Sequence, residues 1–455
     1  MLFNSLAFVV FLPAALGVLF VMPARWQRPW LLAASLVFYS WGGLRDVPLL
    51  LGVVAWTYLC AARCRGPKGH AWMVAGVAGP LALLALYKYG GFVLANLKAT
   101  GLEVSIATGL ALPVGISFFT FKALSFVVGV RRGTVEAVPT LGRYALFVCF
   151  FPPLVAGPIM RPEALIPQLG KEFRFDPTNF VMGLRWMLWG FFKKLAVADV
   201  VAPFVDRAYA PGASPPGPVV AAATVLFALQ IYCDFSGYTD IAVGAARMLG
   251  IELTRNFDRP YFARSLGEFW RRWHISLSTW FRDYVYIPLG GSKHGRHRTA
   301  LNLLVTFGLS GLWHGAGWNF LFWGLWHGAW VALEHLWSPG SRVRTAFLAV
   351  CVLPVVLAGW VLFRADGLGH AAQMIGALGW GWSGDIAGHS IVDALPGIVA
   401  GTAVLALQAR GNDDGPDGSL GRFPRAVRYS AYAILTIWWA VFGAEGGDAF
   451  LYFQF

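Results

Sequence analysis

Long, unbroken runs of apolar residues alternate with short polar segments along most of this chain. Their length is close to the ~20 residues that an α-helix needs to cross the hydrocarbon core of a bilayer. The strands of an outer-membrane barrel would instead show alternating apolar and polar residues over segments of about ten residues. The pattern therefore predicts membrane-spanning helices.

The first half of the chain contains several such runs. No Lys or Arg precedes the first one, so we interpret it as a membrane helix and not as a signal peptide, which begins with a basic region. Basic residues follow the odd-numbered runs, for example Arg25, Arg63 and Arg131. Because cytoplasmic loops carry an excess of Lys and Arg, this distribution predicts an N-terminus outside the cytoplasm. The runs cover residues 5–22, 29–43, 47–62, 71–95, 106–130 and 142–157.

The second half of the chain is less regular. A predicted helix at 180–204 contains Lys193 and Lys194. Residues 252–298 form the most charged stretch, with nine Lys or Arg and four Asp or Glu. This stretch is too polar to span a membrane, and we expect amphipathic helices that lie in the cytoplasmic interface. Further apolar runs cover residues 219–233, 301–313, 318–337, 345–363, 391–408 and 429–443.

Together these patterns predict an all-α, polytopic membrane protein with about ten to twelve membrane segments. We expect a single domain over residues 1–455. Within it, residues 252–300 form the interfacial segment on the cytoplasmic side, and residues 301–337 form helices. No internal repeat is visible, which disfavours the inverted-repeat transporter folds.

The composition agrees with a membrane location. Of the 455 residues, 57% are hydrophobic and 13% are charged, whereas soluble domains have about 25% charged residues. Mean hydropathy is +0.59, and these values exclude a water-soluble enzyme. The net charge of +13 would suggest a nucleic-acid partner in a soluble protein. In a membrane protein it indicates basic cytoplasmic loops and attraction to anionic lipid headgroups, so we expect lipid and no nucleic acid.

Ionisable residues inside apolar runs are costly and are therefore functional candidates. Asp234 and Asp240 close one run in the segment QIYCDFSGYTDIA, next to Tyr238. The carboxylates could line a polar cavity or hold a neighbouring Arg. Equally, they could cap the end of a helix at the interface. The sequence leaves both interpretations open.

Two histidines share a WHG motif. His314 lies in the Gly-rich segment GLSGLWHGAGWN, and LWHG recurs thirteen residues later at His327. On one continuous helix, thirteen residues at 100° each turn the two imidazoles to different faces, so we do not expect a shared site. Dense glycines indicate close backbone approach or a break that lines a cavity. We therefore expect His314 to face a cavity and His327 to be packed and hydrogen-bonded.

A third histidine, His274, lies in the segment EFWRRWHISLSTWFRDYVYIPLGG. Arg271 and Arg272 precede it and could meet phosphate groups, and Ser278 follows it by one helical turn. By composition alone, however, the segment fits an aromatic belt at the membrane interface, with an incidental histidine, somewhat better than a site.

The same segments carry a family resemblance that covers nearly the whole chain. The sequence resembles the membrane-bound O-acyltransferase family, most closely its bacterial branch, typified by the membrane subunit of alginate O-acetyltransferase. The matching segments occur in order, and any one of them alone would be weak. They are FNSLAFVVFLP, WLLAASLVFYSWGG, LPVGISFFTFKALSFVVGVRRG, FFPPLVAGPIMRPEALIPQL, QIYCDFSGYTDIAVGAARMLGIEL, NFDRPYFARSLGEFWRRWHISLSTWFRDYVYIPLGG, GLWHGAGWNFLFWGLWHG and YFQF.

The resemblance implies a ring of membrane helices around a central tunnel, with interfacial or re-entrant helices. It implies that His314 is catalytic and that His274 is the second functional residue. It also implies transfer of an acyl group, most simply acetyl, from a cytoplasmic thioester such as acetyl-CoA. The acceptor would be an extracytoplasmic polysaccharide such as alginate, reached directly or through a periplasmic partner enzyme, at the bacterial inner membrane.

We expect His314 to take the proton of the attacking hydroxyl, and His274 to polarise the carbonyl or to orient a substrate. Arg271 and Arg272 would bind a phosphate of the donor, and Ser278, Asp234, Tyr238 and Asp240 are further candidates for substrate binding. A thioester is already activated, so we expect neither a metal nor a bound cofactor.

Two alternative functions remain open. The first is D-alanyl transfer to teichoic acids, which shares the histidines. The second, from a different class, is polysaccharide transport, which would require charge pairs inside the membrane and repeated halves. Neither feature is visible in the sequence.

Overall fold

The computed structural model describes residues 1–102, 111–337, 342–380, 390–410, 424–442 and 450. Within these ranges all regular secondary structure is helical, which confirms the all-α prediction. The chain divides into two compact units, and each is described here by itself. Unit 1 comprises Met1–Met187 and Thr239–Thr254, and unit 2 comprises Leu188–Tyr238 and Arg255–Phe455. That the chain forms a single domain stays a prediction.

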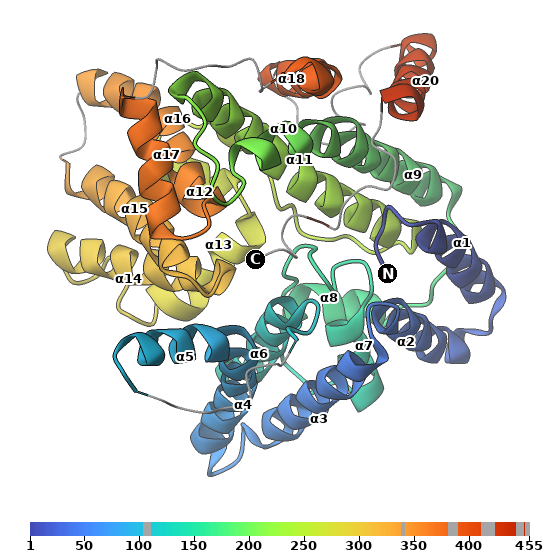
Figure 1. Ribbon diagram of the computed structural model, residues 1–455. Helices are drawn as coiled ribbons and strands as arrows, with labels where there is room; N and C mark the ends of the chain where they lie inside the picture. The colour runs from blue at the N-terminus through green and yellow to red at the C-terminus, as the bar shows by residue number, and fades with distance from the viewer. Residues whose placement is uncertain (103–110, 338–341, 381–389, 411–423, 443–449, 451–455) are drawn as a thin grey trace. The chain divides into compact units, whose positions relative to one another are not determined.

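Unit 1 is built mainly from the N-terminal helices (Figure 1). In its interior α3 packs against α4, α6 and α7. The run predicted at 71–95 is one continuous helical stretch, because a π-helical segment, Ala85–Tyr89, joins α4 to α5. The helices are α1 Leu6–Val21, α2 Ala24–Ser40, α3 Val47–Arg63, α4 Gly69–Leu84, α5 Gly90–Ala99, α6 Ile116–Arg132, α7 Leu141–Cys149 and α8 Pro162–Leu169.

The membrane run predicted at 142–157 is wrong. Helix α7 ends at Cys149, and the residues that follow, 150–160, are buried but not helical. Pro152 and Pro153 explain the end, because proline lacks the N–H group and disfavours helical geometry in the residue before it. The freed backbone finds other partners, such as the Ser35 hydroxyl, which accepts a hydrogen bond from the Phe151 N–H at 3.2 Å.

The run predicted at 106–130 begins later than expected. Helix α6 starts at Ile116, after Gly115, whose φ of +72° is a left-handed conformation that suits glycine. Residues 106–110 of that run lie outside the described residues.

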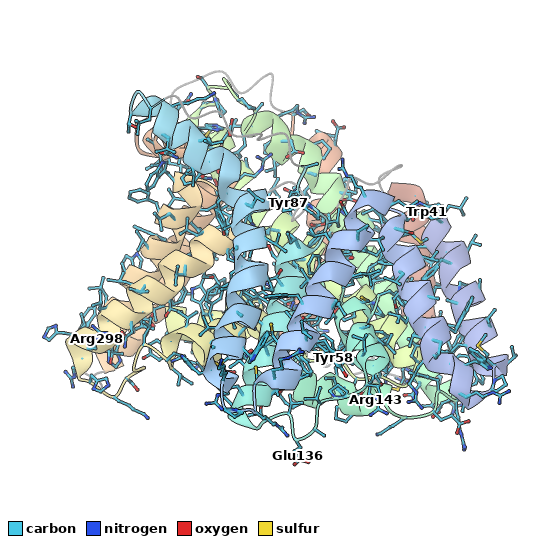
Figure 2. The ribbon with its side chains drawn as sticks, turned by 90° about the horizontal axis from the view of Figure 1, so that it is seen from below. Trp41, Tyr58, Tyr87, Glu136, Arg143 and Arg298 are labelled. Carbon is cyan, nitrogen blue, oxygen red and sulfur yellow. The ribbon has the colours of Figure 1, made fainter. Side chains whose placement is uncertain are left out.

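The basic loops after the third and fifth predicted runs lie at the same end of unit 1. Arg65 donates to the Val135 carbonyl at 2.5 Å, and Arg131 donates to the Cys64 carbonyl at 3.5 Å. Figure 2 shows Tyr58, Glu136 and Arg143 toward one end of this unit, with Trp41 and Tyr87 toward the other. The loops thus share one side, as positive-inside sorting requires. Which side is cytoplasmic stays a prediction.

Unit 2 contains most of the second half of the chain (Figure 1). The helix predicted at 180–204 is present as α9 Pro177–Phe191, a π-helical stretch Phe192–Ala198 and α10 Asp199–Ala208. Residues 177–187 of α9 and residues 239–248 of the next helix belong to unit 1. Helix α11 Gly217–Met248 is much longer than the run predicted at 219–233. The remaining helices are α12 Leu266–Arg272, α13 Ile275–Phe281, α14 Arg296–His314, α15 Trp318–Leu336, α16 Arg342–Arg364, α17 Leu368–Trp380, α18 Leu395–Ala409 and α20 Arg425–Phe442.

The segment 252–298 contains less helix than predicted. Its first half is largely non-helical, and α12 and α13 have only seven residues each. Ser265 starts α12, because its hydroxyl accepts a hydrogen bond from the Glu268 N–H at 3.0 Å. The carboxylate of Glu334 in α15 accepts two more, from Leu266 N–H at 2.5 Å and Gly267 N–H at 3.0 Å. A carboxylate at a helix N-terminus also favours the helix dipole, so α15 holds α12 in place.

Helices α14 and α15 form a tight hairpin that bends at 315–317. Two glycines allow the close approach. A Cβ on Gly311 would lie 2.2 Å from the Phe320 carbonyl oxygen, and a Cβ on Gly324 would lie 2.2 Å from the Phe307 carbonyl oxygen. The glycines around His314 therefore do produce close packing and a chain break, as expected from their density.

Four helical stretches of the described chain are long and apolar enough to cross a membrane, namely Leu44–Arg63, Gly69–Ala99, Gly217–Met248 and Val392–Ala409. Two shorter apolar helices are Leu6–Val21 and Leu348–Arg364. The sequence predicts about ten to twelve membrane segments. That number, the ring and the tunnel stay predictions.

Candidate functional site

His274 occupies a strained position between α12 and α13, each too short to cross a bilayer. Its φ of 42° is left-handed, which is rare for a residue with a side chain. Two backbone hydrogen bonds hold the turn against the preceding segment. Ile275 N–H donates to the Asn256 carbonyl, and Asp258 N–H donates to the Arg272 carbonyl, both at 2.9 Å. The surrounding structure thus maintains a conformation that the histidine alone would not prefer.

The His274 side chain is 1% exposed, so it is not an incidental histidine at the membrane interface. Its ring stands edge-on to the Phe235 ring, with centroids 4.6 Å apart. The Asn256 side-chain oxygen lies 3.0 Å from Nδ1 of His274. The same oxygen accepts hydrogen bonds from the Ser276 N–H and hydroxyl, at 3.2 and 2.9 Å. Burial lowers the pKa of His274 to about 3.

His314 is the last residue of α14 and is 6% exposed. Aromatic rings enclose its imidazole. The centroids of Trp313 and Trp323 lie 4.9 Å from it, and that of Phe363 lies 5.4 Å from it. Helices α14, α15 and α16 therefore together position this side chain.

His274 and His314 are brought together around one tryptophan. The Trp313 ring lies 6.0 Å from the His274 ring and 4.9 Å from the His314 ring, measured between centroids. The two imidazoles are therefore no farther apart than the sum of these distances. His274 and His314, which are forty residues apart in the sequence, thus lie close to the same tryptophan ring in unit 2.

The interpretation of His327 needs correction. It is fully buried and packed, as predicted, but neither ring nitrogen has a hydrogen-bond partner among the described residues. His314 and His327 also do not share one continuous helix, because the chain reverses at 315–317 between α14 and α15. As a result, His327 and His314 both contact the Trp323 ring, at 5.2 and 4.9 Å between centroids.

Asp234 is not a helix cap, because α11 continues for fourteen residues beyond it, to Met248. Its carboxylate lies 2.7 Å from the Lys194 ammonium group, which is also 2.8 Å from Asp199. All three side chains are buried. The structure thus contains a buried charge cluster that the sequence analysis did not find, and the cation that Asp234 holds is Lys and not Arg.

Two other candidates, Tyr238 and Asp240, lie on the same helix, α11. Tyr238 is buried, and its ring centroid lies 4.8 Å from that of Phe450. Asp240 is also buried, in the part of α11 that belongs to unit 1. A role of either residue in substrate binding stays a prediction.

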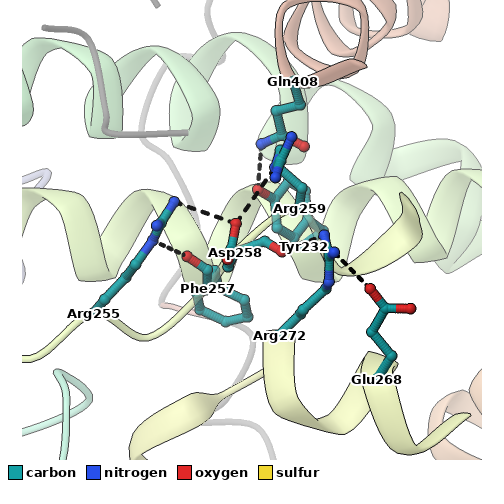
Figure 3. A network of polar contacts seen from close by, with 8 residues as sticks. All are labelled: Tyr232, Arg255, Phe257, Asp258, Arg259, Glu268, Arg272 and Gln408. Carbon is teal, nitrogen blue, oxygen red and sulfur yellow. Dashed lines mark hydrogen bonds and ion pairs between the residues drawn. The ribbon is translucent and has the colours of Figure 1, made fainter. Parts of the chain in front are cut away.

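The two arginines before His274 have different surroundings. Arg272 is engaged by Glu268, whose carboxylate lies 2.6 Å away (Figure 3). Burial alone would raise the pKa of the Glu268 carboxyl. The hydrogen bond from the Arg264 N–H and the positive charge of Arg272 lower it by more, so the pKa of Glu268 lies below its usual value. Arg271 is exposed and makes no hydrogen bond or ion pair to another described residue. Only Arg271 is thus available to an anionic ligand without breaking an existing pair.

Figure 3 shows that further arginines lie close by. Arg255 and Arg259 each lie within 3.5 Å of the Asp258 carboxylate, at 3.5 and 3.4 Å. The Ser278 hydroxyl donates to the Trp273 carbonyl at 3.3 Å and does not join the contacts of His274. The serine that does so is Ser276.

Sequence reasoning missed several residues of this region. Lys194 had a usable signal, since a lysine inside an apolar helix requires a partner. Asn256 and Ser276 had none, because neither the non-helical segment that holds Asn256 nor the seven-residue helix α13 that holds Ser276 is long enough to show a periodicity. In the described residues no three His, Cys, Asp or Glu side chains are grouped as metal ligands would be. The expectation of a metal-free reaction stays a prediction.

Comparison of the sequence with known proteins identifies the family of this chain. The sequence profile of MBOAT, the membrane-bound O-acyltransferase family, matches residues 78–362, which include His274, His314 and Asn256. The chain belongs to the membrane-bound O-acyltransferase family. It is thus an O-acyltransferase and a membrane protein, as the resemblance and the apolar helices predicted.

Three relatives indicate which members of the family this chain is similar to. The chain is 39% identical to "Probable alginate O-acetylase AlgI" of Azotobacter vinelandii over 390 residues, which are 83% of this chain and 78% of the relative. It is 32% identical to "Peptidoglycan O-acetyltransferase" of Helicobacter pylori, over 82% and 79% of the two chains. It is 28% identical to "Teichoic acid D-alanyltransferase" of Streptococcus thermophilus, over 49% and 57%.

Proposed function

We propose that this enzyme transfers an acetyl group from a cytoplasmic thioester to a hydroxyl group that belongs to an extracytoplasmic polysaccharide or to a partner protein that acetylates it. The observation that carries the proposal is the meeting of two buried histidines, His274 and His314, at the Trp313 ring. Acyl transfer to a hydroxyl needs a proton acceptor beside the attacking oxygen and a second group that orients the reactants.

In this proposal His314 accepts the proton of the attacking hydroxyl. The hydroxyl oxygen attacks the carbonyl carbon, a C–O bond forms, and the C–S bond of the thioester breaks. The proton then passes from His314 to the leaving thiolate, so that charge and protons balance. Positioned general-base catalysis of this kind typically contributes about 10²- to 10⁴-fold. His274 polarises the carbonyl or orients one of the substrates.

The proposed donor is acetyl-CoA, which acts as a substrate, with no resident cofactor. Its phosphate groups suit Arg271, whose exposed guanidinium makes no ion pair within the described chain. Arg272 would have to leave Glu268 first, which makes it the weaker candidate. The arginines around Asp258 extend the same basic surface.

The proposed location is the bacterial inner membrane, with the N-terminus in the periplasm. The basic loops at one end of unit 1 support this orientation. The names of the relatives with 39% identity support alginate as the polymer, and the name of the peptidoglycan relative supports peptidoglycan as the second candidate. A periplasmic partner enzyme would complete the transfer.

The alternative of D-alanyl transfer to teichoic acids has weaker support. The relative with that name matches about half of this chain, whereas the alginate relative matches 83%. Transport of a polysaccharide, the alternative from another class, is set aside by membership in a family of acyltransferases.

The test is transfer of labelled acetyl groups from acetyl-CoA in inverted membrane vesicles, with label measured on glycan and on protein. We expect His314→Ala to abolish transfer at an unchanged amount of folded protein. His335→Ala is the matched control, since this histidine is exposed on the neighbouring helix α15. Wild-type transfer by His314→Ala would refute the proposed role of His314.

A further inference from the structure

The contacts of Asn256 determine where the proton of His274 sits. An Asn side chain presents an oxygen that accepts hydrogen bonds and an NH₂ group that donates them. The group facing the His274 turn must be the oxygen, because the Ser276 backbone N–H, which can only donate, points at it from 3.2 Å. The Ser276 hydroxyl donates to the same atom. The orientation of the amide is therefore fixed independently of the histidine.

An accepting oxygen 3.0 Å from Nδ1 of His274 requires Nδ1 to carry a hydrogen. A neutral imidazole has one N–H group, so the other nitrogen, Nε2, then has a free lone pair and can only accept. Nε2 is buried and has no hydrogen-bond partner among the described residues. A buried acceptor without a donor is unfavourable, which makes it a place for a donor from outside the chain.

The neutral state of His274 follows from its surroundings. Burial alone lowers its pKa to about 3. Among the residues that the structure describes, the side chains that contact the ring are Phe235 of α11, Trp313 of α14 and Asn256 of the preceding segment, and none of these three carries a charge. The imidazole is therefore uncharged at neutral pH, and Asn256 selects which tautomer it adopts.

We propose that Asn256 is a positioning residue that holds His274 with its hydrogen on Nδ1, so that Nε2 accepts a hydrogen bond from an O–H or N–H group of the acceptor substrate next to the attacking hydroxyl. This inference rests on the proposed function and deepens it. It selects one of the two roles left open for His274: as an acceptor, Nε2 cannot polarise a carbonyl oxygen, which needs a donor. His274 orients the acceptor substrate through this neighbouring group, and His314 removes the single proton of the attacking hydroxyl.

The decisive variant is Asn256→Asp. A carboxylate accepts the same three hydrogen bonds but adds a negative charge, which favours protonated His274 and raises its pKa. We expect the acid limb of the pH dependence of kcat to move to higher pH by at least one unit, with KM for acetyl-CoA little changed. Asn256→Ala, which no longer selects a tautomer, should lower kcat by at least about tenfold. Thr279→Ala is the control, since this hydroxyl donates to the Ile275 and Ser276 carbonyls and not to Asn256, and it should keep the wild-type pH profile.

All variants are measured in membranes at equal amounts of folded protein, with His314→Ala as the reference for lost catalysis. A wild-type pH profile in Asn256→Asp would overturn the inference, even if Asn256→Ala fails to fold. If His314→Ala is itself fully active, the proposed function fails instead. If His314→Ala is inactive and Asn256→Asp behaves as wild type, only the role of Asn256 is wrong.

Discussion

The glycine contacts between α14 and α15 provide a quantitative test of how His314 is positioned. Gly311 lies three residues before His314 on α14, and the position of a Cβ at residue 311 is 2.2 Å from the Phe320 carbonyl oxygen. Contacts between carbon and oxygen normally begin near about 3.3 Å. In Gly311→Ala the two helices must therefore separate by about 1 Å, since backbone atoms cannot rotate out of the way as a side chain can.

The cost follows from this displacement. Overpacking of a well-packed interior typically costs about 1–3 kcal/mol. For a protein of this size the corresponding decrease in Tm is a few degrees. The effect on catalysis should be larger, because a displacement of about 1 Å in a reacting group can reduce the rate about 100-fold. We thus expect Gly311→Ala to fold with reduced Tm and to lose most acyl transfer.

The assay combines thermal unfolding in detergent with acetyl transfer in membranes. Gly308→Ala, one turn earlier on α14, is the matched control. There a Cβ would lie 3.4 Å from the end of the Leu325 side chain, which is an ordinary contact. We expect this control to keep wild-type Tm and activity. If Gly311→Ala matched it in both measurements, the close helix contact would not be what positions His314.

Three further predictions concern charged and titrating groups. Lys194→Met removes the cation that pairs with two buried carboxylates and should destabilise the protein by about 3–5 kcal/mol. The triple variant Lys194→Met, Asp199→Asn, Asp234→Asn should recover most of the lost Tm. Equal Tm in wild type and the single variant would contradict this prediction. Between pH 6.5 and about 3 the unfolded chain binds a proton at His274 that the folded chain does not, so the free energy of unfolding falls as pH falls, by about 2 kcal/mol at pH 5. His274→Gln should remove this acid sensitivity of Tm, and the exposed His297→Gln should not. Arg271→Gln should raise KM for acetyl-CoA severalfold but leave KM for acetyl-pantetheine, which lacks the adenosine phosphates, unchanged; equal effects on both donors would exclude a phosphate contact.

The apolar runs predicted the positions of many helices well. The runs at 5–22, 47–62 and 318–337 coincide with α1, α3 and α15 to within a residue or two. Hydrophobic length is a reliable signal for such helices, because every backbone group within them is satisfied locally. The run at 142–157 failed for the complementary reason. Its backbone is satisfied by distant partners, which an apolar run does not reveal.

The candidate site was predictable in part. Glycine density and family motifs identified His314 and His274, but not the groups that hold them. Asn256 and Lys194 act through partners that are distant in sequence, and only the fold brings them together. The phase argument for His327 failed because a turn at 315–317 replaced a straight helix.

Helix α15 serves both histidines at once. Glu334, near its C-terminal end, caps α12, which leads into His274, while Gly324 and Trp323 pack against α14 and the His314 ring. Substitutions in these two neighbourhoods should therefore show epistasis, because each changes the same supporting helix. A sequence change on α15 therefore has to be compatible with the positions of both histidines.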